Sequence, residues 1–550
     1  MTTVLKNARI FSPSTATESG DGFASWMVIK NDQIVHIGSL DEIIPPEDAT
    51  TIDLHNRIVI PGFIDAHVHI LQYGLSLRKV DLIRCTSLEQ IQQTIKTYAE
   101  THPSVPRILC RGWIQSTVDG TPLASMLDGI DTRPIYIEAA DLHSTWCNLA
   151  ALDEMEAHTT PDPPGGTIHR DENGRASGLL SEGAVMSFIW PFLDRVTSKE
   201  DKLDALRTAI KSYSAAGYTG VVDMAMSEDA WEILNLYRHD NKIPFHMAAH
   251  WLVPFSSNHD INFSHVDRAI ELRRQFNEPD FCIAGIKLMC DGVVDGCTAA
   301  LHQPYVGKKD PIDPIWPSEM MSQVIHRADA AGLQIAIHAI GDLAVHQSIN
   351  LLSALNTQDQ NQIQSSQPIR RHRIEHLELT SPDDAKRLGR LGITASVQPV
   401  HSDPAHFKVW PDLIGKARCK RAFAYKEFLD GGATVAFGTD APTAAHFPFP
   451  NLYNATTRRS AVEPDSQVTL NPEFGLELVQ AISAATEGAA YSRFAEDWTG
   501  ALKKGLSADF VVVEMDWTPE RLLEARVLQT WYRGKKVFDF VMDNEDGDGY

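Results

Sequence analysis

The chain has 550 residues, of which 43% are hydrophobic and 22% are charged, and its formal net charge is −23. This composition is typical of a globular protein that is long enough for one large domain and a smaller one. The acidic balance argues against nucleic acid or an anionic membrane as a partner, because both are bound through clustered lysine and arginine side chains. The charge says little about a small-molecule substrate, which we expect from the candidate site described below, and a homodimer stays open as the assembly.

The amino terminus, MTTVLKNARIFSPS, lacks the basic region and long apolar core of a secretion signal. No later run of about 18 apolar residues could span a bilayer. Seven cysteines without C-x-x-C spacing are typical of reduced thiols in the cytosol rather than of a disulfide framework. These features predict a cytoplasmic protein.

Short β-rich segments open and close the chain. Residues 4–11 and 25–39 are predicted strands, the latter with a turn at Asn31 and Asp32, and residues 507–515 and 530–540 offer similar material. Such segments cannot bury both faces alone. We expect them to pair in one small β-sandwich domain made of residues 1–57 and 490–550.

Between these ends, apolar strands alternate with helical patterns, which is typical of a parallel α/β sheet. The predicted strands lie within residues 58–70, 218–224, 245–251, 281–289, 333–340, 371–377, 393–400 and 433–440. Eight such strands predict that residues 58–489 form a (β/α)8 TIM-type barrel, with its reactive groups at the carboxyl ends of the strands. Residues 79–208 are too long for one barrel loop, so we interpret them as a large insertion after strand 1 that covers the barrel mouth.

The first barrel strand, IVIPGFIDAHVHI, ends in two histidines two residues apart. Strand alternation places His67 and His69 on one face, with Asp65 on the same face. Paired histidines can also be ordinary polar residues at a strand end. The preceding Pro-Gly and the candidates on other strands favour a metal site.

Several further strand ends carry groups that can bind metal. Together with the first pair, the candidate ligands are His67, His69, Lys287, His338, His376 and Asp440. Each could be structural on its own, and Asp440 in GTDAP could simply make a turn. Six such groups on five strand ends nevertheless predict one metal centre at the rim of the barrel.

Lys287 stands in the apolar run CIAGIKLMC, where a buried amine should lose its proton. A neutral amine can add carbon dioxide, and the resulting carbamate can bridge two metal ions. The alternative is a lysine paired with Asp291 or Asp295. Two divalent ions would lower the pKa of bound water towards neutrality, and Asp440 could take the proton of that water and pass it to the leaving group.

The motif PGFIDAHVH, the strand-4 lysine, the histidines of strands 5 and 6 and the motif GTDAP together resemble the amidohydrolase superfamily. The resemblance narrows to its YtcJ-like branch, which includes N-substituted formamide deformylase. The segments that carry it are DLHSTWCNLAAL, PPGGTIHRDENGRASGLLSEGA, IKLMCDGVVDGCTAALHQPY, IHAIGDLAV, RIEHLEL and SVQPVH. The resemblance covers nearly the whole chain.

This resemblance implies His67, His69, His338 and His376 as ligands, a carboxylated Lys287 that bridges two ions, and Asp440 as both ligand and general base. Two zinc ions per chain are expected, because imidazole and carboxylate ligands suit zinc. It also implies that residues outside the metal shell choose the substrate. The candidates for substrate binding are Trp113, Gln115, His143, Asp291, Gln398 and His401. Each of them could be structural instead, and His143 could equally cap a helix.

The predicted function is hydrolysis of a non-peptide C–N bond, in an amide, formamide or cyclic imide, through a metal-bound hydroxide and an aspartate general base. One alternative keeps the metal site and changes the reaction to deamination, decarboxylation or C–C bond cleavage. The other is a binding protein that retains the fold without catalysis, and an intact ligand set argues against it.

Overall fold

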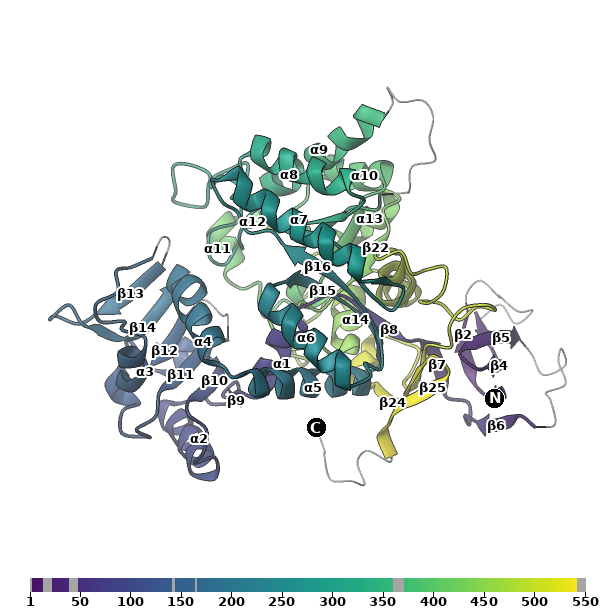
Figure 1. Cartoon of the computed structure of the whole chain (residues 1–550), viewed down its shortest axis with the longest axis horizontal. Coiled ribbons are helices and arrows are strands. Elements are labelled where there is room, and N and C mark those ends of the chain that lie inside the picture. Colours follow the sequence, from purple (N-terminus) through teal and green to yellow (C-terminus); the bar gives the residue numbers. More distant parts are fainter. Residues whose placement is uncertain are drawn as a thin grey trace. The chain divides into compact units, whose positions relative to one another are not determined.

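A computed structural model, shown in Figure 1, describes residues 2–12, 22–38, 48–140, 144–163, 166–359 and 370–541. The chain divides into two compact units. The barrel unit consists of Met1–Ile70 with Ile210–Tyr550, and the second unit consists of Leu71–Ala209. Among the helices of the described ranges, none combines the length and hydrophobicity that a bilayer crossing requires.

The central sheet of the barrel unit contains eight parallel strands, and neighbours in the sheet follow one another in sequence. The strands are β8 (Phe63–Val68), β15 (Tyr218–Met226), β16 (His246–Leu252), β18 (Phe281–Met289), β19 (Gln334–Ala339), β20 (Arg373–His376), β21 (Thr394–Val397) and β22 (Val435–Phe437). Each overlaps one of the eight predicted strands. The prediction of a TIM-type (β/α)8 barrel is confirmed.

Helices follow the strands and cover the outside of this sheet (Figure 1). These helices include α6 (Glu228–Asp240), α7 (His259–Gln275), α8 (Ser318–Ala330), α9 (Asp342–Asp359), α10 (Pro382–Leu391), α13 (Tyr425–Asp430), α14 (Pro448–Thr457) and α15 (Leu478–Ser483). Two of these helices have an N-cap serine. The side chain of Ser227 accepts a hydrogen bond from the Ala230 amide in α6, and that of Ser381 accepts one from the Asp384 amide in α10. Because helices cover the strands, every residue of β19 and β20 is buried.

The barrel closes where the chain after β22 meets β8. The Asp440 amide donates to the carbonyl of His67 at 2.7 Å, and the His69 amide donates to the carbonyl of Ala441 at 3.1 Å. The Asp65 carboxylate accepts from both the amide and the hydroxyl of Thr439, at 2.9 and 2.5 Å. Closure therefore brings the carboxyl ends of the first and last barrel strands together.

Strands from both ends of the chain pair with one another outside the barrel. One sheet has the order β5-β4-β1-β6 and the other β25-β24-β23-β7-β2-β3. Their strands are β1 (Thr2–Lys6), β2 (Arg9–Phe11), β3 (Phe23–Ala24), β4 (Trp26–Lys30), β5 (Gln33–Gly38), β6 (Thr50–Asp53), β7 (Ile58–Pro61), β23 (Phe510–Glu514), β24 (Arg526–Tyr532) and β25 (Lys535–Asp539). Val59 of β7 lies opposite Val512 of β23, so residues about 450 positions apart share one sheet. The turn between β4 and β5 falls at Asn31, whose φ of 59° suits asparagine.

The second unit has a six-stranded sheet of its own, with the order β13-β14-β12-β11-β10-β9. Its elements are β9 (Val80–Asp81), α2 (Leu88–Thr101), β10 (Ile108–Trp113), β11 (Ile135–Ala139), β12 (Ser144–Cys147), α3 (Leu149–Glu154), β13 (Gly166–Arg170), β14 (Ala176–Glu182) and α4 (Trp190–Val196). Helices α1 (Ile70–Leu77) and α5 (Lys199–Ala215) span its two boundaries with the barrel unit. The place of this segment over the barrel mouth stays a prediction.

We predict that Gly438→Ala destabilises the barrel unit. The added methyl carbon would lie 2.5 Å from both the amide nitrogen and Cβ of His67, so the chain after β22 would have to move away from β8. Overpacking of this kind costs about 1–3 kcal/mol, and the midpoint of thermal unfolding should fall. Gly129→Ala is the matched control, because nothing lies within 4 Å of its added methyl group. Equal midpoints for the two variants would contradict this account of closure.

Candidate metal centre

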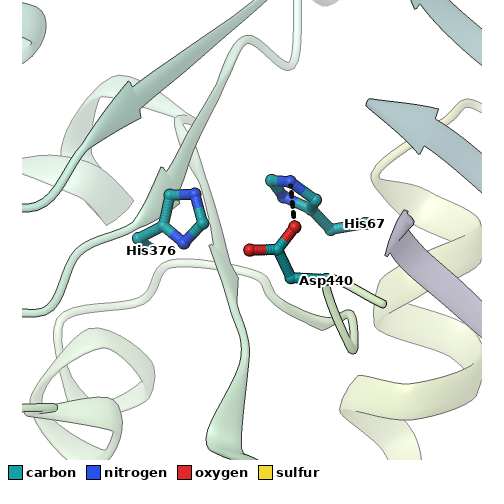
Figure 2. A group of neighbouring side chains, drawn as sticks. All are labelled: His67, His376 and Asp440. Atoms are coloured by element: carbon teal, nitrogen blue, oxygen red, sulfur yellow. Dashed lines mark ion pairs between the residues drawn. The ribbon is translucent and has the colours of Figure 1, made fainter. Parts of the chain in front are cut away.

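The six predicted ligands all lie at the carboxyl ends of barrel strands. His67 belongs to β8, Lys287 to β18, His338 to β19 and His376 to β20, while His69 and Asp440 follow β8 and β22. Figure 2 shows His67 and His376 on either side of the Asp440 carboxylate. The metal-binding atoms of these three residues all lie within 4.8 Å of one another. Three strands far apart in the sequence thus contribute to one cluster.

Two imidazoles approach the same oxygen of Asp440. Oδ1 lies 3.4 Å from Nε2 of His67 and 3.2 Å from Nε2 of His69. Ligand atoms at about 2.1 Å from one zinc ion in a tetrahedron lie about 3.4 Å apart. The spacing of these atoms therefore suits shared ligation of a divalent ion.

His376 and His338 extend the cluster to the neighbouring strands. The ring of His376 lies 5.0 Å from that of His67 and 4.4 Å from that of His338, measured between centroids. Nδ1 of His376 is buried, and none of the described residues offers it a hydrogen bond. A buried ring nitrogen without a partner is costly unless a ligand satisfies it. The donor set therefore fits a metal ion.

Burial sets the charge of the candidate ligands. It lowers the pKa of His67 to about 4 and that of His338 to about 3, and it holds the pKa of His376 well below its usual value. These imidazoles are neutral at pH 7 and so have lone pairs to give. Burial favours the neutral acid of Asp440, but the surrounding His67 and His69 outweigh it and keep the pKa of the carboxyl well below its usual value.

A buried ion pair holds the first histidine in place. Nδ1 of His67 lies 2.8 Å from Oε2 of Glu375, and Oε1 of Glu375 accepts from Nε of Arg373 at 2.5 Å. Arg373 also donates to the carbonyl of Ala66 at 2.7 Å. A carboxylate that accepts the Nδ1 proton leaves Nε2 free to bind metal and fixes the ring plane. Glu375 therefore orients His67 towards Asp440.

Lys287 is buried, and burial lowers its pKa to about 8, although the Glu375 and Asp440 carboxylates act in the opposite direction. Within the part of the chain that the structure describes, Lys287 forms no ion pair with Asp291. The carboxylate of Asp291 instead accepts from the amides of Ala300, Ile340 and Gly341 at 2.8–3.0 Å. The geometry therefore speaks against pairing of this lysine with Asp291.

Two of the candidate ligands have a strained backbone. His376 has a φ of 76° and Asp440 a φ of 56°, and Leu377 after His376 has a φ of 54°. Residues other than glycine rarely adopt these values, and such strain concentrates at functional sites. His376 and Glu378 lie on either side of Leu377, and each has a metal-binding atom within 4.8 Å of the other's and of one on His401, so His376 belongs to two groups of candidate ligands.

The predicted substrate-binding residues fall in different places. Nε2 of Gln398 lies 3.2 Å from Nδ1 of His67, and Nε2 of His401 lies 3.8 Å from Oδ2 of Asp440, so both reach the cluster. Trp113 and Gln115 belong to the second unit: Trp113 is buried beside Trp146, and Gln115 donates to Ser144. His143 lies outside the described residues. The roles of all six residues stay predictions.

Sequence reasoning missed two carboxylates at this site. Glu375 is fully buried between His67 and Arg373, and Glu378 is buried beside His401. The available signal was the segment RHRIEHLEL, in which charged residues alternate with apolar ones along a strand expected to be covered on both faces. A charged residue that a strand buries needs a partner.

Comparisons with known proteins agree with this geometry. A family model described as "Amidohydrolase family" matches residues 50–538. The chain belongs to this family. Membership in this family makes the protein a hydrolase, as the motifs predict.

The relatives of this amidohydrolase match it over most of their length. YtcJ of Bacillus subtilis is 28% identical, over 89% of this chain and 90% of the relative. N-substituted formamide deformylase of Arthrobacter pascens is 24% identical, over 97% of this chain and 98% of the relative. The crystal structure of an uncharacterized metal-dependent hydrolase from Pyrococcus horikoshii has the same fold, with a TM-score of 0.76 at 23% identity, over 94% of this chain and 99% of that one. The predicted resemblance to the YtcJ-like branch is confirmed.

We predict that Glu375→Gln lowers both metal affinity and stability. The neutral amide oxygen accepts the Nδ1 proton of His67 more weakly than the carboxylate does, and a change in such an outer partner costs about 10–100-fold in metal affinity. It also leaves the guanidinium of Arg373 buried without its carboxylate, which costs about 3–5 kcal/mol. Competition with a chromophoric chelator measures the first effect and thermal unfolding the second. Glu463→Gln, which removes an exposed pair with Lys408, is the control. Unchanged zinc affinity in Glu375→Gln would show that Glu375 does not orient His67.

Proposed function

We propose that this amidohydrolase hydrolyses a non-peptide C–N bond, in an amide, formamide or cyclic imide of a small organic molecule, with two zinc ions per chain. The observation that carries the proposal is the cluster of neutral histidines around the ionised Asp440 at the rim of the barrel. Imidazole and carboxylate donors suit zinc. The resemblance to a formamide deformylase over 97% of the chain supports the choice of bond.

In this proposal His67, His69, His338, His376 and Asp440 would hold the ions, and Lys287 would be a further ligand as its carbamate. Divalent ions bound there supply a Lewis acid that polarises the scissile carbonyl and lowers the pKa of water towards neutrality. The remaining steps belong to residues of the chain.

Asp440 moves the proton. Its carboxylate is ionised and faces both His67 and His69. A carboxylate so placed accepts a proton from the attacking water and delivers it to the nitrogen that leaves, which an amine needs in order to depart. Both tasks require an ionisable oxygen at one position, and Asp440 provides it.

The first test is metal content followed by a panel of amides, formamides and cyclic imides. We expect purified protein to contain about two divalent ions per chain by elemental analysis. Removal of the ions with a chelator should abolish hydrolysis, and added zinc, manganese or cobalt should restore it. Protein that holds no metal and gains no activity from any of the three ions would overturn the proposal. Hydrolysis of none of the panel by metal-loaded protein would overturn the choice of bond.

We predict that Lys287 takes up carbon dioxide. Because only the neutral amine reacts, uptake of labelled bicarbonate by metal-free protein should rise as pH increases through about 8, the pKa that burial gives this lysine. Lys287→Ala should lose both the carbamate signal in carbon-13 spectra and about one metal ion per chain. Exposed Lys408 supplies the control variant, Lys408→Ala. Full metal content in Lys287→Ala would exclude the bridging role.

We predict that Asp440→Asn separates catalysis from metal binding. The histidines and Lys287 remain as ligands, so most of the metal should stay bound. The amide cannot accept a proton at neutral pH, and turnover should fall by about two orders of magnitude or more, which is what general-base catalysis contributes. Parallel measurements of metal content and turnover check this. Turnover near the parent value would assign the proton transfer to another residue.

A further inference from the structure

A second carboxylate–imidazole pair lies beside the candidate metal centre. Glu378 follows β20, and His401 lies in the short turn η6 (Pro399–Ser402) that follows β21. Nδ1 of His401 lies 3.5 Å from Oε1 of Glu378, and Nε2 on the other side of the ring lies 3.8 Å from Oδ2 of Asp440. The imidazole of His401 thus spans the distance from Glu378 to the metal centre.

Hydrogen bonding at Thr443 shows which atom of His401 carries a proton. Oγ1 of Thr443 donates its only proton to the carbonyl of Asp440 at 2.6 Å. The same oxygen lies 3.2 Å from Nε2 of His401 and can therefore only accept there. Nε2 must be an N–H donor, and its proton points towards the side of the ring where Asp440 lies.

Glu378 has no lysine or arginine partner among the described residues, and its side chain is buried. It therefore differs from Glu375, which is paired with Arg373. The carboxylate of Glu378 faces Nδ1 of His401, so it lies on the opposite side of the ring from Nε2 and from Asp440. A carboxylate in this place fixes the orientation of the ring and leaves the Nε2–H directed towards Asp440.

The ring of His401 lies parallel to the ring of His376, with an angle of 8° between the planes and 5.9 Å between the centroids. The side chain of His401 is still 20% exposed, in contrast to the 1% of His67. A ligand can therefore reach this ring, and a ligand oxygen can replace Thr443 as the acceptor of the Nε2 proton.

We propose that Glu378 is a positioning residue that holds His401 so that its Nε2–H binds an oxygen of the substrate next to Asp440. The inference rests on the proposed function and deepens it, because it assigns a hydrogen-bond acceptor to the substrate near the bond that breaks. His401 makes the contact, and Glu378 acts only through His401. Substrates without an oxygen at that position lose this contact.

The test is a double-mutant cycle on the binding of acetohydroxamate to zinc-loaded protein, measured by calorimetry. The variants are Glu378→Gln, His401→Gln and the double variant, and Glu378→Asp serves as the conservative change. We expect each single variant to weaken binding about tenfold, the value of one hydrogen bond to a charged or paired group. The double variant should be no weaker than His401→Gln alone, because Glu378 has nothing left to position. Glu378→Asp should recover part of the affinity.

Metal content and thermal unfolding are measured on the same samples. Glu154→Gln is the matched control, since Glu154 pairs with Arg107 in the second unit, and it should bind the hydroxamate like the parent. Three results would overturn the inference: additive losses in the double variant, loss of metal in Glu378→Gln, or a parent that does not bind the hydroxamate. The losses of hydroxamate affinity can be non-additive even if the protein hydrolyses none of the amides, formamides and cyclic imides. That result would sustain the inference about Glu378 and His401 and would overturn the proposed C–N bond as the substrate bond.

Discussion

Closure of the barrel between its first and last strands is the constraint on which the candidate metal centre depends. A single buried carboxylate, that of Asp65, accepts from the amides of His67 and Thr439 and from the hydroxyls of Thr439 and Tyr213. Burial raises the pKa of Asp65 to about 6, and these hydrogen bonds act against that rise. Because Asp65 lies two residues before His67 and Thr439 lies one residue before Asp440, the same contacts that close the sheet also place the two ligands. Fold stability and site geometry therefore share one set of interactions.

Burial gives the rim of the barrel its chemistry. In water, an amine such as that of Lys287 would be protonated at pH 7, and exposed histidines would be partly so. Burial lowers the pKa of His67, His338 and His376 far enough that these imidazoles are neutral at pH 7 and have free lone pairs. It lowers the pKa of Lys287 to about 8, so that this amine loses its proton at a much lower pH than a lysine in water. Glu375 adds a buried carboxylate to this region, and its ion pair with Arg373 compensates the negative charge. A site rich in neutral donors and fixed carboxylates is suited to cations.

The sequence predicted the barrel and the places of the six candidate ligands because both follow from strand periodicity. A strand fixes which face a residue occupies, so His67 and His69 could be assigned to one face, and parallel strands bring their carboxyl ends to one rim. Periodicity says nothing about what a side chain contacts across the sheet. The pairing of Glu375 with His67, 308 positions away, and the left-handed turn at His376 depend on the register of strands that meet only in the folded chain. Trp113 shows the same limit, because its place at a strand end did not reveal that its side chain packs in the core of the second unit.

A carboxylate faces an imidazole twice at the carboxyl end of β20. Glu375 and Glu378 lie on either side of His376, and each faces a different histidine, His67 and His401. One pair leaves a ring nitrogen free for metal, and the other leaves an N–H for a ligand. The central claim of this account is that the strand ends form a metal centre around Asp440. Anomalous X-ray diffraction from crystals grown with zinc tests it most directly. The account predicts a peak beside Oδ1 of Asp440, in contact with Nε2 of His67 and Nε2 of His69. A map without a peak at this position, from protein that binds zinc elsewhere, would contradict it.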